Sequence, residues 1–445
     1  MKIETFSGIM LTLLLIGMLS LVFDIQQVRA SGTVFIRADG SVDPPTANIT
    51  SIDNVTYTFT DNNYDEIVIE RDNIVIDGVG YTVQGTGGGT GIDLSGRNNV
   101  TIKNLEINAF DYGIWLDYSS NNSIYGNNIT TNPSNFAGIW VYNSSGNNIY
   151  SNNMTDNYNA IYLESSSYNS IHGNNLTQNY RGIMLSSMFG VSSNNNIYGN
   201  NIVDNWHGIR LQYSSNNSIS QNYVANSYFG IWLYWSSNNT VSGNDIVANN
   251  LDGIRVEGSP HNNILGNQIS NNYHGIEIRP YTGAPKSSNN TISRNNITTN
   301  SYYGVWIYWS PNNTIFHNNI IDNAEQVHIN YDSPNIWDNG CEGNYWSDYS
   351  GIDSNGDGIG DTPYLIDASN QDNYPLMSPY VVGDLNHDGT VDINDLLLVD
   401  NAYGSEAGDT DWNCHCDITG PEEKSDGLID IHDLATVGRN YGKTA

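Results

Sequence analysis

A short motif recurs throughout the centre of the sequence. Segments that read Gly-Ile-Trp-Leu, or a close variant of it, return about every 22 residues. They begin at Gly91, Gly113, Gly138, Ala160, Gly182, Gly208, Gly230, Gly253, Gly275 and Gly304. A period of this length is typical of a solenoid, in which each repeat is one coil that buries its apolar side chains against its neighbours.

Each repeat contains three short apolar segments. In one copy, Ile114 and Leu116 are separated by a single residue, the alternation of a strand whose alternate side chains enter a core. Ile124 and Ile129 follow between Asn and Gly turn residues, and each adds one inward side chain. We therefore predict an all-β chain that forms a right-handed parallel β-helix solenoid over residues 66–340, with coils of about 22 residues.

Asparagine pairs return at the predicted turns. They occupy residues 121–122, 147–148, 216–217, 238–239 and 262–263. Coils stacked at the strand spacing would place these amides above one another, where they can hydrogen-bond along the axis. The pairs therefore predict a structural ladder rather than a recognition site.

Residues 31–65 precede the regular coils. The first coil is expected at residues 67–69 and 74–76, each of which reads as a strand. An uncovered parallel edge would invite aggregation. Residues 33–60, rich in Thr, Ile and Val, are therefore the candidate N-terminal cap.

The first 30 residues have the pattern of a secretory signal peptide. Lys2 precedes an uncharged run over residues 6–23, and Val28-Arg29-Ala30 offers small residues before Ser31. The alternative is an uncleaved N-terminal anchor. Both predict export, and cleavage near Ser31 would leave a secreted, extracellular chain in which we expect no membrane span.

The charge balance narrows the range of partners. The chain has 47 acidic and 15 basic residues, a formal net charge of -32. Such a surface repels nucleic acid and attracts divalent cations. We therefore expect no nucleic-acid partner.

The cysteines and histidines offer few conventional sites. Three cysteines, Cys341, Cys414 and Cys416, exclude a full disulfide framework, although Cys341 could pair with one of the other two. The nine histidines are scattered along the chain, and no copper or zinc site is expected from them.

Two outward positions of the first strand form columns in the predicted stack. One column reads Trp115, Trp140, Tyr162, Met184, Arg210, Trp232, Arg255, Glu277, Trp306 and His328, and the other Asp117, Tyr142, Glu164, Ser186, Gln212, Tyr234, Glu257, Arg279, Tyr308 and Asn330. Rings at solvent positions either stabilise the sheet by stacking or bind the apolar faces of sugars. Both interpretations stay open.

Two longer coils favour sugar binding. Additional residues 187–194 and 280–288 follow the same strand and could form the two walls of a groove about 19 Å long. Its predicted carbohydrate-binding floor consists of Arg210, Gln212, Trp232, Tyr234, Trp235, Arg255 and Glu257.

The same face contains candidate catalytic residues. Glu257 and Glu277 lie diagonally on adjacent coils, about 7 to 8 Å apart, within the range of an inverting glycosidase pair. The alternative is two exposed ion pairs, Arg255 with Glu277 and Glu257 with Arg279, that perform no chemistry.

Comparison with known enzyme types leaves these candidates weak. Hydrolases of the polygalacturonase type need an aspartate cluster and a Gly-His-Gly segment, whereas His274-Gly275 lacks the first glycine and an Asp pair nearby. A lyase needs calcium carboxylates and a basic residue near the cleft, which only Arg210 and Arg255 partly supply. Glu257, Glu277 and Arg255 thus stand as catalytic candidates for a polysaccharide lyase or glycoside hydrolase.

The coils resemble the parallel β-helix repeats of NosD-type and carbohydrate-associated exported proteins. Gly-Asn-Tyr-Trp-Ser-Asp-Tyr at residues 343–349 and Asp-Asn-Tyr-Pro-Leu-Met at 372–377 are similar to the closing signature of this family. The resemblance implies the β-helix fold and an archaeal-type surface protein. It does not select an activity, because the family includes lyases, hydrolases, epimerases, adhesins and proteins associated with copper-enzyme maturation.

Three acidic loops predict calcium binding, because they place oxygen ligands at alternating positions around glycine turns. The first lies in a closing segment and linker, residues 341–380, and offers Asp353, Asn355, Asp357, the Ile359 carbonyl and Asp361. The second offers Asp384, Asn386, Asp388, Thr390, Asp392 and Asp395. The third offers Asp417, Asp426, Leu428, Asp430 and Asp433.

Residues 381–445, with two loop-helix repeats, resemble a dockerin, a small α-helical domain that holds Ca2+ and docks on a cohesin. The first helix is expected over residues 396–402. The second repeat departs from the pattern, since Glu422 and Lys424 occupy ligand positions and Asp417 could replace them only if residues 420–424 bulge outward.

Together these features predict an exported carbohydrate-binding β-helix that attaches through a calcium-dependent dockerin-like module to a cell-surface or multiprotein scaffold. A cohesin-like protein would be the scaffold partner. The alternatives are a polysaccharide lyase or glycoside hydrolase, and a structural or adhesive surface protein without catalysis.

Overall fold

The computed structural model describes residues 32–131, 136–187, 190, 192–283, 285–418 and 426–445. The predicted signal peptide, residues 1–30, lies outside the described residues. The chain divides into two units, Met1–Thr33 and Val34–Ala445. All the elements described below belong to the second unit.

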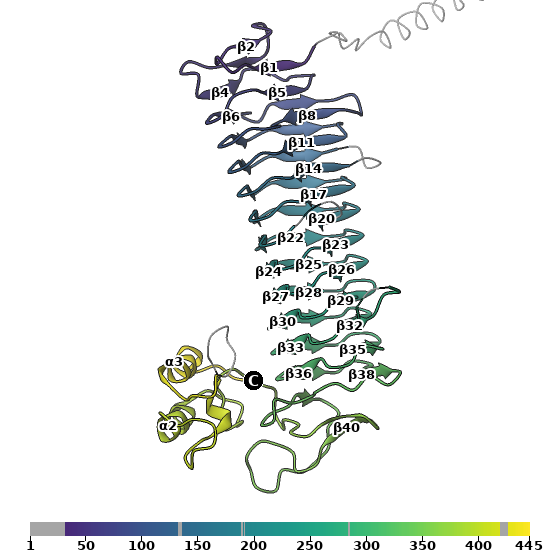
Figure 1. Ribbon diagram of the computed structural model, residues 1–445, viewed down its shortest axis with the longest axis vertical. Helices are drawn as coiled ribbons and strands as arrows, with labels where there is room; N and C mark the ends of the chain where they lie inside the picture. Colours follow the sequence, from purple (N-terminus) through teal and green to yellow (C-terminus); the bar gives the residue numbers. More distant parts are fainter. Residues whose placement is uncertain (1–31, 132–135, 188–189, 191, 284, 419–425) are drawn as a thin grey trace, which may run out of the picture. The chain divides into compact units, whose positions relative to one another are not determined.

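Three parallel sheets, named A, B and C, form a β-helix (Figure 1). Sheet A contains β2 (Val42–Asp43), β1 (Val34–Ile36), β5 (Ile67–Ile69), β8 (Thr90–Asp93), β11 (Tyr112–Asp117), β14 (Ala137–Tyr142), β17 (Asn159–Glu164), β20 (Arg181–Ser186), β23 (His207–Gln212), β26 (Phe229–Tyr234), β29 (Asp252–Glu257), β32 (His274–Arg279), β35 (Tyr303–Tyr308) and β38 (Glu325–Asn330). This confirms the predicted parallel β-helix fold.

Sheets B and C consist mostly of three-residue strands. Sheet B contains β3 (Ile49–Thr50), β4 (Thr56–Phe59), β6 (Val75–Asp77), β9 (Thr101–Lys103), β12 (Ser123–Tyr125), β15 (Asn148–Tyr150), β18 (Ser170–His172), β21 (Asn196–Tyr198), β24 (Ser218–Ser220), β27 (Thr240–Ser242), β30 (Asn263–Leu265), β33 (Thr291–Ser293) and β36 (Thr314–Phe316). Sheet C contains β7 (Thr82–Gln84), β10 (Glu106–Asn108), β13 (Asn128–Thr130), β16 (Asn153–Thr155), β19 (Asn175–Thr177), β22 (Asn201–Val203), β25 (Tyr223–Ala225), β28 (Asp245–Val247), β31 (Gln268–Ser270), β34 (Asn296–Thr298), β37 (Asn319–Ile321) and β39 (Tyr345–Trp346).

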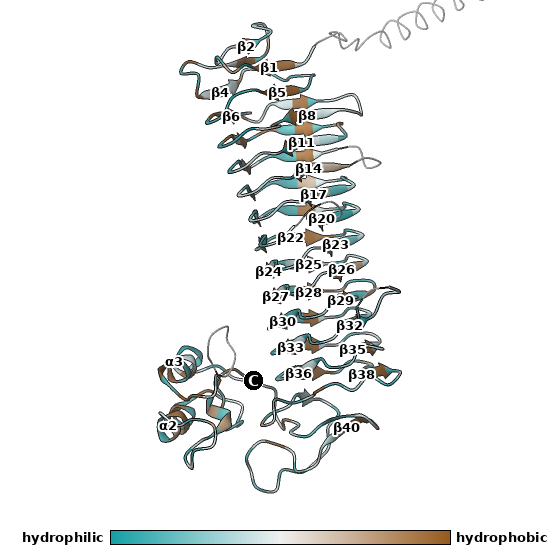
Figure 2. Cartoon of the chain, viewed as in Figure 1, coloured by the Kyte–Doolittle hydropathy of each residue, from teal (hydrophilic) through white to brown (hydrophobic). Residues whose placement is uncertain are grey.

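The core is built from like residues stacked on like. Ile114 pairs in register with Ile139, and Ile124 with Ile149. Both members of each pair are fully buried. Figure 2 shows hydrophobic residues in the strands and hydrophilic residues at the turns. The inward positions predicted from the repeat are therefore the core positions.

Steric contact explains the glycine that is the second residue of most sheet A strands. A Cβ atom on Gly113 would lie 2.5 Å from the Gly138 carbonyl oxygen and 2.7 Å from Ile129 Cγ2. The equivalent atom on Gly275 would lie 2.5 Å from the Gly304 carbonyl oxygen. Glycine is favoured at this position because the backbone of the strand packs directly against the next coil.

Asparagine forms buried ladders at three positions of the coil, whereas the predicted pairs lie at one of them. The first links residues such as Asn122 and Asn147, whose side chains join Nδ2 to Oδ1 at 3.0 Å. A second passes through Asn127 and Asn152, and a third through Asn157. Asn147 stacks on Asn122, so residues 147–148 are shifted by one position from the predicted alignment with 121–122.

The N-terminal segment extends the solenoid earlier than predicted. Strands β1 and β4 pair in parallel with β5 and β6, so coil formation begins at Val34 rather than at Ile67. Strands β2 and β3 then pair antiparallel with β1 and β4 and end sheets A and B.

The C-terminal residues form a small helical module. A hairpin of β40 (Tyr364–Asp367) and β41 (Asn370–Asp372) precedes α2 (Ile393–Ala402), the short 3-10 helix η1 (Cys414–Cys416) and α3 (Ile431–Asn440). The module core contains Leu385, Val391, Val399, Ala402, Cys416, Ile418, Ile429 and Val437. Among the described residues, no helix is long and apolar enough to span a bilayer.

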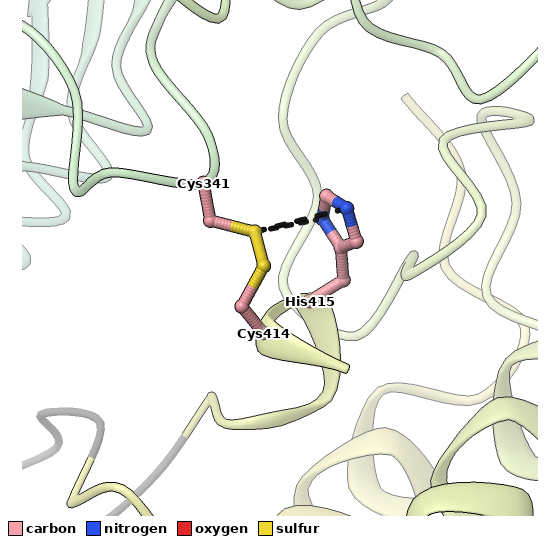
Figure 3. A group of neighbouring side chains, drawn as sticks. All are labelled: Cys341, Cys414 and His415. Atoms are coloured by element: carbon pink, nitrogen blue, oxygen red, sulfur yellow. Dashed lines mark hydrogen bonds between the residues drawn. A yellow bond between two sulfur atoms is a disulfide. The ribbon is translucent and has the colours of Figure 1, made fainter. Parts of the chain in front are cut away.

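The module is bonded to the last coils. Cys341 forms a disulfide with Cys414 (Figure 3). Cys416 is free and buried. The Arg294 guanidinium donates to the Ile418 carbonyl at 3.0 Å. These contacts tie a turn of the solenoid and the closing segment to the module.

Candidate functional site

The outward residues of sheet A form continuous columns. Strand pairing places Arg210, Trp232, Arg255 and Glu277 side by side on successive coils. Gln212, Tyr234, Glu257 and Arg279 form the adjacent column. The residues expected to form a carbohydrate-binding floor thus lie on β23, β26 and β29, with Trp235 directly after β26.

Trp232 lies between two arginines. The Arg210 guanidinium carbon is 4.3 Å from the centre of the Trp232 ring, and the Arg255 guanidinium carbon is 5.5 Å from it. Such contacts orient both a cation and a ring. Trp232 remains partly accessible.

An ionic cluster lies beside this ring on β29 and β32. Arg255 Nε is 3.1 Å from Asp252 Oδ2 and 2.5 Å from Glu277 Oε2. Arg279 contacts Glu277 at 3.2 Å and Glu257 at 3.6 Å. The cluster contains the two ion pairs considered from the sequence, together with Asp252, which sequence reasoning missed.

The prediction that these ion pairs are exposed was wrong. The side chains of Glu277 and Glu257 are only 1% and 8% exposed, and that of Asp252 is 0% exposed. Sequence reasoning considered two outward columns and overlooked a third, formed by the residue that begins each sheet A strand. Aromatic rings on the coils before and after the cluster flank it. They are Phe229 and Trp232 on β26, and Tyr303 and Trp306 on β35.

Burial changes the protonation of the cluster. Burial, and then the charge of Asp252, raise the pKa of Glu277 to about 7. Burial also raises the pKa of Glu257. A carboxyl group that keeps its proton near neutral pH can act as a general acid, but Glu277 is almost fully covered. Glu257 lies closer to the surface.

His274 also has a carboxylate partner that the sequence motif did not reveal. Its Nδ1 lies 2.8 Å from Asp252 Oδ1, and the two residues are 22 positions apart. Burial lowers the pKa of His274 to about 4. The single aspartate Asp252 lies beside this histidine because one coil of the solenoid separates them, but it is not the aspartate pair that a polygalacturonase-type hydrolase needs.

A cationic patch lies on the coils next to this cluster. Arg181 begins β20, and Arg210 lies on β23. Neither forms an ion pair with any described residue, and the buried Nε atoms of both lack hydrogen-bond partners within the described part of the chain. Burial, and then the charges of Arg210 and Arg181, lower the pKa of His207 to about 3. We call Arg181, His207 and Arg210 the cationic patch.

Exposed rings stack beside the cationic patch. Tyr180 and Trp206 are 39% and 46% exposed and stack with their planes 10° apart. Trp206 also stacks on Tyr228 at 4.3 Å. The Arg181 guanidinium carbon lies 4.9 Å from the Tyr180 ring. Sequence reasoning missed these rings, although each comes one position before a sheet A strand.

The second insertion does not stand at the end of a groove. Tyr281, within residues 280–288, contacts the rings of Tyr234 at 5.1 Å and Trp235 at 6.1 Å. These partners lie two coils away from the insertion. The insertion therefore leans over the predicted floor, whereas part of the first insertion, residues 188–189 and 191, lies outside the described residues.

Two of the acidic loops share one backbone conformation. In the closing loop, Gly358 N donates to Asp353 Oδ2 at 2.9 Å and Ile359 N to Asp357 Oδ1 at 3.0 Å. In the loop before α2, Gly389 N donates to Asp384 Oδ2 at 2.9 Å and Thr390 N to Asp388 Oδ1 at 3.0 Å. Asn355 and Asn386 each donate to the carboxylate two positions later, Asp357 and Asp388 respectively. Asp361 accepts from Ser354 N at 2.9 Å.

The third loop matches the second at its two ends. Asp417 Oδ2 accepts from Gly427 N at 2.9 Å, as Asp384 does from Gly389. Asp433 and Asp395 each close a capping box at the start of a helix, with Asp430 and Asp392 as the N-caps. The proposed bulge at residues 420–424 lies outside the described residues. Asp426 accepts from the Leu428 amide at 3.1 Å.

Three histidines that are scattered along the sequence lie close together around one glutamate. His317 Nε2 is 2.6 Å from Glu342 Oε2, and His387 Nε2 is 3.2 Å from Glu342 Oε1. His415 Nδ1 contacts the same Oε1 atom. The four residues come from β-helix, closing segment and module, so their proximity depends on how the chain folds back and has no signature in the sequence.

Comparison with solved structures identifies proteins that are similar in fold. DFA-IIIase from Arthrobacter chlorophenolicus A6 in complex with GF2 is 12% identical, with 56% of this chain and 83% of that chain covered and a TM-score of 0.45. The Dettilon tailspike protein (gp208) is 16% identical, with 58% of this chain covered and a TM-score of 0.40, and the present chain spans 62% of its length. The periplasmic alginate epimerase AlgG is 16% identical, with coverages of 64% and 80% and a TM-score of 0.36.

Comparison at the sequence level gives a more direct result. No curated protein matches the chain. The family profile described as periplasmic copper-binding protein (NosD) matches residues 31–207 and 188–351. Since these matches cover more than half of the sequence, the chain belongs to the NosD family.

Proposed function

We propose that the chain binds an anionic polysaccharide on the outer face of sheet A, at the cationic patch and the rings beside it. The observation that carries this proposal is the pair Arg181 and Arg210, two arginines without a carboxylate partner among the described residues of a chain whose net charge is -32. The carboxylate of a sugar acid would accept hydrogen bonds from the guanidinium groups of these two arginines.

Aromatic stacking alone does not make a binding site. Sheet B also has an outward aromatic stack, in which Tyr125, Tyr150, His172 and Tyr198 lie at 4.7 to 5.1 Å spacing. No arginine contacts that stack among the described residues. The stack on sheet B is therefore structural, whereas Tyr180, Trp206 and Trp232 adjoin unpaired cations. Rings next to donors suit a sugar that has both an apolar face and a charge.

A binding panel of uronate-containing and neutral polysaccharides tests this function. We expect the uronate polymers to bind, with affinity that falls as salt is added. The double variant Arg181→Gln and Arg210→Gln should lose at least tenfold in affinity, while Arg439→Gln, at an exposed arginine of α3, should bind as wild type. Equal binding of all three proteins would refute the proposal.

A polysaccharide lyase or glycoside hydrolase is the second candidate. The raised pKa of Glu277, about 7, and the position of Glu257 at the edge of the cluster favour it. Assays for new reducing ends and for unsaturated uronate products on the same panel distinguish binding from turnover. Wild-type turnover in both Glu257→Gln and Glu277→Gln would assign these residues to structure.

We also propose that the protein is exported, and that residues 381–445 bind Ca2+ and dock on a cohesin-like scaffold at the cell surface. The matching carboxylate conformations at Asp384 and Asp417 support this proposal, because each loop leads into a helix with the same capping box. Retention of the protein on an immobilised cohesin-like domain in calcium, and its release by a chelator, is the expected result. Retention that a chelator does not change would contradict it.

A further inference from the structure

We propose that Glu342, His317, His387 and His415 form a binding site for one divalent transition-metal ion where the C-terminal module meets the coils. His317 follows β36, Glu342 lies in the closing segment, His387 in the loop before α2 and His415 in η1. One ligand atom each from Glu342, His387 and His415 lies within 4.8 Å of the others. His317 approaches the second oxygen of Glu342 at 2.6 Å.

His415 hydrogen-bonds to the Glu342 carboxylate, whereas the other two imidazoles do not. His317 and His387 are buried, with 5% and 8% of each residue exposed. Their Nε2 atoms lie within ion-pair distance of Glu342, yet neither makes a hydrogen bond of acceptable geometry with any described residue. Buried nitrogens are rarely left without a partner. Ligation of an ion between the side chains would satisfy them.

The surroundings hold the four side chains in place. The Tyr380 ring stacks on His317 at 4.1 Å with the planes 9° apart. A Cβ atom on Gly358 would lie 2.3 Å from His387 Cβ, so the closing loop packs tightly against this histidine. His415 directly follows Cys414, which is bonded to Cys341 (Figure 3). Ligands fixed in this way lose little freedom when a metal binds.

The donor set selects the class of metal. Calcium prefers six to eight oxygen ligands, whereas this cluster offers three imidazoles and one carboxylate. Such donors suit Zn2+ and Cu2+, which bind nitrogen at about 2.0 to 2.1 Å. The sulfurs of Cys341 and Cys414 are joined in a disulfide and supply no thiolate.

The site differs from anything that the family assignment alone provides. The family description names copper, but His387 and His415 lie beyond the matched residues, which end at 351. Residues of the C-terminal module therefore complete this site. The inference does not depend on the proposed glycan binding, because it involves neither sheet A nor the cationic patch.

Isothermal titration of the metal-free, intact protein with Zn2+ and separately with Cu2+, both in saturating Ca2+, tests the inference. We expect one ion to bind per chain, with Cu2+ tighter than Zn2+. His387→Ala should weaken binding by more than the 10- to 100-fold typical of outer-shell changes. A smaller imidazole contribution to the X-ray absorption spectrum of the metal-loaded variant would show that His387 is itself a ligand.

Two further variants keep the test decisive. Glu342→Gln removes the shared carboxylate and should abolish binding, but it alters a buried residue, so its folding has to be checked first. His415→Ala alters a half-buried residue and should leave the fold intact, which circular dichroism checks. The control is His328→Ala, because His328 also pairs with a glutamate, Glu325 at 2.9 Å, but no other histidine contacts that glutamate among the described residues. Absence of binding by the wild type, or equal binding by wild type, His387→Ala and His415→Ala, would overturn the proposal.

Discussion

The coils and the C-terminal module keep their folds by different means. The coils share one continuous core of stacked apolar residues, which runs from Val34 to Trp346. Among the residues of the module that the structure describes, eight buried residues form its core. Around it, Asp395 and Asp433 point inward and accept backbone hydrogen bonds from Leu385 and Ile418. In the coils, repetition of the same apolar positions buries enough surface to hold the fold. The module has a small core, so we expect its fold to depend on cations that neutralise its acidic loops and on the disulfide that connects it to the coils.

Calcium removal should separate the two regions most strongly. Clustered carboxylates such as Asp384, Asp388 and Asp395 repel one another without a cation. The small apolar core of the module buries too little surface to offset this repulsion. We expect excess chelator to unfold residues 383–442 while the β signal of the coils persists. Hydrogen exchange resolved by mass spectrometry measures both regions in one sample.

A paired variant supplies the control for that experiment. Asp384→Ala with Asp388→Ala should reproduce the effect of the chelator on the loop before α2 even in calcium. Equal protection of residues 383–442 with and without chelator would show that the disulfide and the Glu342 contacts maintain the module without calcium.

Core truncation in the coils should have the next largest effect. Ile209 is fully buried on β23, and Ile209→Ala removes apolar contacts and leaves a cavity. We expect a loss of about 2 to 5 kcal/mol in unfolding free energy. Leu397→Ala is the control on α2, where the side chain is 50% exposed and the expected change is below about 0.5 kcal/mol. Denaturant titration followed by circular dichroism compares the two.

The buried ionic cluster should make the coils sensitive to pH. The pKa of Glu277 rises from 4.5 to about 7 on folding, so the folded chain binds this proton more tightly than the unfolded chain. The stabilising contribution is complete below about pH 4.5 and is lost, by about 3 kcal/mol, as the pH rises to about 7. Glu277→Gln should flatten this dependence. An unchanged slope in unfolding experiments between pH 5 and 7 would contradict the assignment.

Breaking one asparagine ladder should have the smallest effect of the four. Asn222 Nδ2 donates to the Ile197 carbonyl at 2.9 Å and to Asn244 at 3.0 Å. Asn222→Ala leaves buried groups unpaired and should cost about 1 to 3 kcal/mol. Asn201→Ala, in an exposed ladder, serves as the matched control and should cost less. Equal effects in thermal unfolding would show that burial does not decide the strength of a ladder.

The repeat predicted most of the fold because its information is local. Two apolar residues separated by one outward residue, such as Ile114 and Leu116, specify a strand and its buried face. Stacking at a constant period then fixes which coil follows which. The additional ladders escaped notice because the positions of Asn127 and Asn157 are recognised as stacked only once the register of the coils is known.

The candidate sites could be predicted only in part. Columns on sheet A followed from the repeat, but the burial of Glu277 depends on its neighbours in the stack, Arg255 and Trp306, which lie on the adjacent coils. On α2, the apolar Leu397 is half exposed whereas the acidic Asp395 is buried, an inversion that composition does not predict. The histidine cluster requires a fold-back between residues 317 and 415, which no local pattern encodes.

The disulfide between Cys341 and Cys414 also changes how the molecule would transmit a mechanical pull. A force applied to the chain beyond Cys414, for example at α3, passes through the sulfur bridge directly to Cys341. Residues 342–413, which include the closing loop, the loop before α2 and α2 itself, are thereby shielded from stretching. Tension would arrive at the last coils of the solenoid, where parallel strands share it through many hydrogen bonds.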